Sequence, residues 1–119
     1  MATKELIWEK VANTKDDLVF AENNIAVTEL NGKKICIGIF NNEMFAFGYS
    51  CPHAGGILAN GHFDSLGNVV CPIHRYKFCV HNGRNLSGEG YYLPHWPVAI
   101  KKDGIFIGIE KSKTWFPWF

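Results

Sequence analysis

Four residues that can bind a metal are grouped in two short stretches of the chain. The first stretch holds Cys51 and His53, and the second, separated from His53 by 17 residues, holds Cys71 and His74. Thiolates and imidazoles are the side chains that bind zinc and iron–sulfur clusters. Because each pair is closely spaced, one tight loop can direct both side chains of a pair to one point. We therefore expect two loops that together form a metal site.

The residues next to these pairs favour rigid loops. Pro52 and Pro72 each follow a cysteine directly, and a proline fixes the backbone angle φ at its position. Gly55 and Gly56 follow the first pair and allow the backbone to approach other atoms closely.

Three kinds of metal centre could use this pattern. Structural zinc with two Cys and two His usually takes its two Cys from one stretch and its two His from the next. A four-cysteine cluster would need Cys36 and Cys79 in addition, and their spacing matches no such motif. A [2Fe–2S] centre with two Cys on one iron and two His on the other suits loops that each offer one of each. The pattern favours this third centre and leaves zinc open as an alternative.

The elements that must position these loops are mostly β-strands. Asn-Gly at 31–32 and Asp-Gly at 103–104 are strong hairpin signals, and Asn-Asn at 41–42 is a further turn. No stretch of 11 or more residues has a convincing helical period. The chain is therefore expected to be all-β, with a small antiparallel β sandwich or barrel as its base. The expected strands are residues 5–11, 25–30, 33–40, 43–48, 68–71, 77–80, 98–102 and 105–109.

Residues 50–97 differ from the rest of the chain. They contain four of the five prolines and all five histidines, a composition typical of turns and loops. We expect one domain, residues 1–119, in which a loop-rich site-bearing subdomain, about 50–97, is inserted into the β base.

Composition excludes several classes of function. The net charge is +1 without a basic cluster, so neither nucleic acid nor an anionic membrane is an expected partner. We find no signal sequence and no apolar run of membrane-spanning length, so the expected location is cytoplasmic. In that compartment, paired cysteines and histidines indicate a metal rather than disulfides.

The sequences CPH at 51–53 and CPIH at 71–74 resemble the Rieske iron–sulfur motif. Weaker similarity continues in GHFD at 61–64, RYKF at 75–78 and LSG at 86–88, and in all it covers about residues 5–110. The resemblance implies one [2Fe–2S] cluster as the cofactor. Its metal ligands would be Cys51 and Cys71 on one iron and His53 and His74 on the other. It also implies a β base that carries a smaller cluster-binding subdomain.

The resemblance implies one-electron transfer at low potential, without catalysis by the chain itself. High-potential relatives have a disulfide between the positions of Gly56 and Ile73, and hydroxyl donors at the positions of Tyr76 and Phe78. Lacking these, the chain is expected near the bottom of the Rieske range of roughly −150 to +300 mV. The expected partners are a reductase and a terminal oxygenase, with the electron leaving through the histidine end. Relatives often have proline soon after the Ser-Gly at 87–88, whereas here it first appears at Pro94.

Two other functions remain open. One is the Rieske-like small subunit of an assimilatory nitrite reductase, and the other is a zinc-stabilised binding module without a redox role. The histidines His62, His81 and His95 are expected to be surface or hydrogen-bonding residues rather than ligands. Cys36 is expected to be a small buried hydrophobe, and Cys79 to face away from its two neighbours. The aromatic residues 114–119 are expected either to fold onto the β base or to form an interaction surface.

Overall fold

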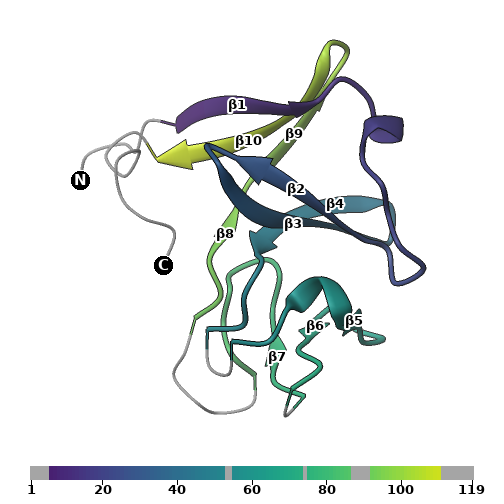
Figure 1. Ribbon diagram of the computed structural model, residues 1–119, viewed down its shortest axis with the longest axis vertical. Coiled ribbons are helices and arrows are strands. Elements are labelled where there is room, and N and C mark those ends of the chain that lie inside the picture. The colour runs from purple at the N-terminus through teal and green to yellow at the C-terminus, as the bar shows by residue number, and fades with distance from the viewer. Residues whose placement is uncertain (1–5, 53–54, 74, 87–91, 111–119) are drawn as a thin grey trace.

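The computed structural model describes residues 6–52, 55–73, 75–86 and 92–110 (Figure 1). The two predicted histidine ligands and the aromatic segment 114–119 lie outside these residues. The structure is built from short strands and two single-turn 3₁₀ helices, η1 (Lys15–Asp17) and η2 (Leu58–Asn60). The strands are β1 (Leu6–Ala12), β2 (Ile25–Leu30), β3 (Lys33–Phe40), β4 (Glu43–Gly48), β5 (His62–Phe63), β6 (Val69–Val70), β7 (Lys77–Phe78), β8 (His95–Trp96), β9 (Val98–Lys101) and β10 (Gly104–Glu110).

Three antiparallel sheets form the fold. A four-stranded sheet has the order β2-β3-β4-β8, and a three-stranded sheet has the order β1-β10-β9. Together they make the base, in the upper part of Figure 1. The third sheet, β5-β6-β7, lies below them and is formed within the loop-rich middle of the chain.

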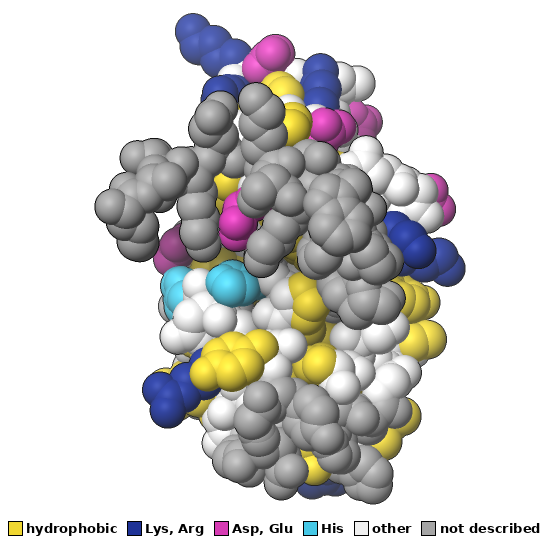
Figure 2. All heavy atoms as spheres, turned by 90° about the vertical axis from the view of Figure 1, so that its left-hand side faces the viewer, with side chains coloured by type: hydrophobic (Ala, Val, Ile, Leu, Met, Phe, Trp, Pro, Cys, Tyr) yellow, Lys and Arg dark blue, Asp and Glu magenta, His cyan; other side chains and the backbone are white. Residues whose placement is uncertain are grey.

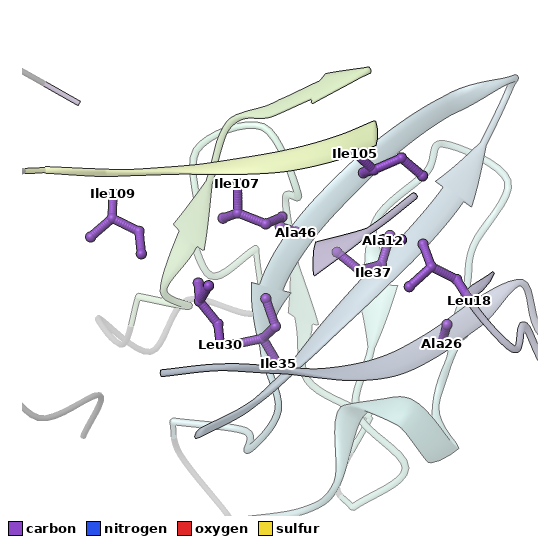
Figure 3. Close-up of a cluster of buried hydrophobic side chains, with 10 residues drawn as sticks. All are labelled: Ala12, Leu18, Ala26, Leu30, Ile35, Ile37, Ala46, Ile105, Ile107 and Ile109. Carbon is purple, nitrogen blue, oxygen red and sulfur yellow. The ribbon is translucent and has the colours of Figure 1, made fainter. Parts of the chain in front are cut away.

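The base is held together by apolar side chains between its two sheets (Figure 3). In β10, Ile105, Ile107 and Ile109 alternate toward this core and are at most 3% exposed. From β3, Ile35 and Ile37 meet them and are fully buried. Full burial of an isoleucine side chain contributes about 1.5–3 kcal/mol, so this core is a main source of stability for the base.

The opposite face of the four-stranded sheet supports the loop-rich part. Phe47 from β4 and Cys36 from β3 are both fully buried on that face. They belong to a second apolar cluster, which also contains Cys51 and Cys71. One sheet therefore packs on both faces and connects the base to the stretches that carry the predicted ligands.

Gly38 of the base and Phe63 of the loop-rich inserted part approach each other closely and join the two parts. A Cβ atom added at Gly38 would collide with the Phe63 ring, so only glycine leaves room for that ring on β3. The Phe63 ring also packs edge-on against Phe47, with 6.3 Å between the ring centroids. These contacts therefore fix the position of the inserted part on the base.

The predicted all-β class is confirmed. The strands at 25–30, 33–40 and 43–48 have the expected bounds, and those predicted at 5–11, 98–102 and 105–109 differ at their ends by one residue at most. The short strands predicted at 68–71 and 77–80 are smaller than expected. The strands β5 and β8 were not predicted, because each has only two residues and so cannot show an alternating pattern. No helix among the described residues has the length and apolar character needed to cross a membrane.

Candidate metal centre

The two stretches with the predicted ligands form loops that are closed in the same way. The N–H of Cys51 donates to the carbonyl of Gly56 at 2.7 Å, and the N–H of Cys71 donates to the carbonyl of Tyr76 at 2.8 Å. In both loops the bond joins the cysteine to the residue five positions later. Each cysteine therefore stands at the start of a short loop whose ends are tied by the backbone.

The structure brings the thiols of Cys51 and Cys71 together. They lie close enough for the Cys51 thiol to raise the pKa of the Cys71 thiol. They are 3% and 0% exposed, so both lie beneath the surface. His53 and His74, the other two predicted ligands, lie outside the described residues, and their assignment stays a prediction. Two adjacent thiols in an apolar setting could both bind one metal ion.

The electrostatic setting of Cys71 is that of a buried thiol. Burial raises the pKa of Cys71 to about 11, the hydrogen bond from the Ile73 N–H lowers it, and the adjacent Cys51 thiol raises it. This N–H lies 3.4 Å from the Cys71 sulfur. A metal ion removes the proton from a thiol that coordinates it. The Ile73 N–H would then stabilise the charge on that sulfur.

Gly56 and Ile73 form the contact between the two loops. A Cβ atom added at Gly56 would lie 2.9 Å from the Cys71 sulfur and 3.1 Å from two side-chain carbons of Ile73. These are the two positions at which the resemblance places a disulfide in high-potential relatives. The structure confirms that the positions are adjacent, and apolar packing occupies the place of the bond.

Apolar side chains surround the thiols. Leu58 and Phe78 are fully buried in the same cluster as both cysteines. High-potential relatives have a hydroxyl donor at the position of Phe78. In this structure the Phe78 side chain has no hydroxyl and packs in the core. The backbone of Tyr76 closes the second loop through its carbonyl.

A third loop repeats the backbone pattern of the first. The N–H of Cys79 donates to the carbonyl of Arg84 at 2.9 Å, again five positions later. The glycine four positions after each cysteine, Gly55 or Gly83, donates back to that cysteine's carbonyl and has a φ angle of 71° or 75°. The matching sequence signal, C-x-H-x-G at 79–83, was overlooked. The structure nevertheless pairs Cys51 with Cys71, the partner that the sequence predicted.

The remaining cysteines and histidines have other settings. Cys36 is fully buried, and burial raises its pKa to about 12, so it is an unreactive core residue, as predicted. The ring of His81 packs edge-on against Phe45, with 4.9 Å between the centroids. His62 is exposed on β5, and His95 is exposed on β8. Figure 2 draws one face of the molecule and shows histidine side chains close together on it. Among the described residues, no group of three or more Cys, His, Asp or Glu side chains could hold a metal ion.

Comparison with known proteins gives a family match over most of the chain. The family model for the Rieske [2Fe-2S] domain matches residues 7–92. The chain is also 27% identical over 75 residues to a 3-phenylpropionate/cinnamic acid dioxygenase ferredoxin subunit from Photorhabdus laumondii. That alignment covers 62% of this chain and 71% of the relative.

Solved structures share the fold. The ferredoxin of carbazole 1,9a-dioxygenase from Nocardioides aromaticivorans aligns with a TM-score of 0.70 and 20% identity, over 84% of this chain and 95% of that one. A Mycobacterium tuberculosis protein described as the small subunit of an NADH-dependent nitrite reductase has the same TM-score and identity, over 88% and 96%. At this identity, the two likenesses support the fold.

Proposed function

Since this chain belongs to the Rieske [2Fe-2S] domain family, we propose that it is a low-potential one-electron carrier between a reductase and an oxygenase. The cluster would be held by Cys51 and Cys71 on one iron and by His53 and His74 on the other. The curated relative is a ferredoxin subunit of a dioxygenase, which supports an oxygenase as the electron acceptor. On this proposal the chain transfers electrons and catalyses no bond change itself.

The observation that carries the proposal is the meeting of the Cys51 and Cys71 thiols at the heads of two similarly closed loops. The donor set fits the group, because a [2Fe–2S] cluster of this type takes two thiolates on one iron. When bound, the cluster supplies reversible one-electron oxidation and reduction. The chain's own residues hold the thiols below the surface, exclude water with Leu58 and Phe78, and donate one N–H to the Cys71 sulfur.

We propose a potential near the bottom of the Rieske range of roughly −150 to +300 mV. Hydrogen bonds to cluster sulfur favour the reduced, more negative state, so fewer of them lower the potential. Phe78 offers no hydroxyl, and Ile73 and Gly56 stand where a disulfide would be. A redox titration checks this, and a midpoint well above zero would contradict it.

The proposal includes a cytoplasmic location and a single domain. All four cysteines are free thiols, as expected in a reducing compartment. The face of the four-stranded sheet that buries Phe47 shares one apolar cluster with both ligand cysteines, which supports folding as one unit.

One measurement tests the proposal directly. Iron, sulfide and zinc are quantified in the purified protein, and the reduced protein is examined by EPR. Two irons, two sulfides and a Rieske-type signal per chain are expected, and the variant Cys71→Ala should lose all three. One zinc ion without a signal would instead identify a zinc-stabilised module.

A second measurement separates the two electron-transfer functions. In a pull-down, a free carrier should bind a reductase and an oxygenase weakly and reversibly. Stable association with a sirohaem subunit would overturn the oxygenase assignment and identify a nitrite reductase small subunit.

A further inference from the structure

A pocket of about 650 Å³ lies apart from the thiols, where the chain after η1 passes the turn between β3 and β4. These segments lie on the right of Figure 1. Its apolar lining comes from Phe20, Ile39 and Phe40. Its polar lining consists of Lys15 and three asparagines, Asn24, Asn41 and Asn42. Of these seven residues, four are polar and three are apolar. Pockets of this size that combine an apolar surface with convergent polar groups are typical small-molecule sites.

The apolar part of the pocket is held rigidly. The Phe40 ring packs against Phe63, with 5.8 Å between the ring centroids. On another side, a Cβ atom added at Gly67 would come within 2.8 Å of the Phe40 ring, so glycine there leaves room for it. The backbone N–H of Ile39 donates to the carbonyl of Asn24 at 3.0 Å, which joins the pocket's two sides. The aromatic surface is therefore preformed.

The asparagine at position 42 is not the residue that the turn itself prefers. Both central residues of the β3–β4 turn have left-handed backbone angles, with φ of 51° at Asn41 and 64° at Asn42. Glycine is strongly preferred at the second position of such a turn. The β2–β3 turn follows this preference with Asn31 and Gly32, at φ of 53° and 80°. The β3–β4 turn instead keeps a second amide, and that amide lines the pocket.

The polar groups of the pocket are available to a ligand. Within the described part of the chain, neither the Lys15 ammonium nor the three asparagine side chains form a hydrogen bond or an ion pair. Among the described residues, the lining contains one cation and no acidic residue. A ligand with a single negative charge therefore complements it, and the phenylalanine rings favour a flat apolar body.

We propose that this pocket binds a small aromatic monocarboxylate. The ring of the ligand would pack against Phe20 and Phe40, and its carboxylate would accept hydrogen bonds from Lys15 and from the amide of Asn42. The site is separate from the proposed metal centre, and its existence does not depend on that function.

The experiment uses benzoate as the probe and the full-length, cluster-loaded protein. Binding is followed by saturation-transfer NMR of the ligand, with benzyl alcohol as a neutral probe of similar shape. A ligand this small should bind in the millimolar range, with benzoate tighter than benzyl alcohol. Replacing Lys15 by Gln should weaken benzoate binding about two- to fivefold, the range of an exposed ion pair.

The decisive variant is Asn42→Gly, because it removes the amide while suiting the turn. Its melting temperature should equal or exceed that of the wild type, and its affinity for benzoate should fall about two- to tenfold, as for one lost hydrogen bond. Asn31→Gly, in the other hairpin, is the matched control and should leave binding unchanged. Equal affinity of wild type and Asn42→Gly, or of benzoate and benzyl alcohol, would overturn the proposal.

Discussion

Replacing Gly56 by alanine tests the geometry of the candidate metal centre. The new methyl group would lie 2.9 Å from the Cys71 sulfur and 3.1 Å from two carbons of Ile73, where ordinary contacts exceed 3.4 Å. The carbonyl of Gly56 accepts the N–H of Cys51, so the loop cannot move without straining that hydrogen bond. The substitution should therefore displace one ligand loop from the other.

The size of the effect follows from the kind of clash. Overpacking in a well-packed region costs about 1–3 kcal/mol. For a chain of this length, 1 kcal/mol corresponds to about 4 °C in melting temperature, so Gly56→Ala should melt about 4–12 °C lower. Two other glycines, Gly32 and Gly55, have φ of 80° and 71° and no atom within 4 Å of an added Cβ. Alanine at either should cost only the left-handed backbone conformation, about 1–2 kcal/mol.

Iron content separates the clash from simple loss of stability. Gly32→Ala lies in a remote hairpin and should keep wild-type iron per chain although it costs a similar amount of stability, whereas Gly56→Ala should lose iron. Adding Ile73→Ala to Gly56→Ala removes one of the two clashes and should recover part of both quantities. If Gly56→Ala melts like Gly32→Ala and retains full iron, the loops are not packed as tightly as described.

Three further predictions concern residues around the centre. Cys36→Ser should lower the free energy of unfolding, measured with denaturant, by about 1–3 kcal/mol, because it buries a hydroxyl in an apolar core. Cys79→Ser, at a partly exposed site, should change that free energy little. Neither substitution should change the iron content. Gly83→Ala should lower the melting temperature more than Gly32→Ala, because its Cβ would collide with the carbonyl of Leu93 in addition to straining a left-handed backbone; equal losses would refute the collision. Burial raises the pKa of Asp64, but hydrogen bonds from Asn68 and Leu66 and the charge of Lys77 outweigh it and hold the pKa below the usual range. The stabilisation by Asp64 is thus complete above the ordinary aspartate pKa and disappears as pH falls through the lowered one, and Asp64→Asn should flatten that part of the stability curve.

The base could be predicted from sequence because its signals are local. The Asn31-Gly32 turn fixes the register of β2 on β3, so the bounds of both strands were correct. The strands of the inserted part have two residues each, and a pattern of period two cannot show in two residues. The inserted part packs on the base through Phe63 and Gly38, residues that are 25 positions apart. Such contacts have no local signature.

The site shows the same division. The cysteine spacing predicted that Cys51 and Cys71 lie together, and the structure places their thiols next to each other, while their role as ligands stays a prediction. Burial of Cys36 followed from its place in a strand of the base. What the sequence could not show is how the loops close, because a hydrogen bond from Cys51 to Gly56 uses only backbone atoms. The repeated closure at Cys79, in contrast, has a sequence signal, because residues 51–55 and 79–83 share the pattern C-x-H-x-G. Judged by residue types alone, Cys79 and His81 of that third loop could equally have been predicted as metal ligands.

The contacts between the ligand loops indicate that metal binding and loop docking are coupled. Each loop is tied to itself by its own backbone hydrogen bond, through the N–H of Cys51 or of Cys71. Between the described residues of the loops, the structure has the adjacent thiols and the packing of Ile73 on Gly56, with no covalent bond. Ile73 is 41% exposed, so this packing excludes water from one side only. A metal group bound to both thiols would join the loops, and its binding energy would add to the stability of their docked arrangement. Loss of metal should therefore loosen the loops while the core between the two sheets of the base, which contains neither cysteine, stays folded.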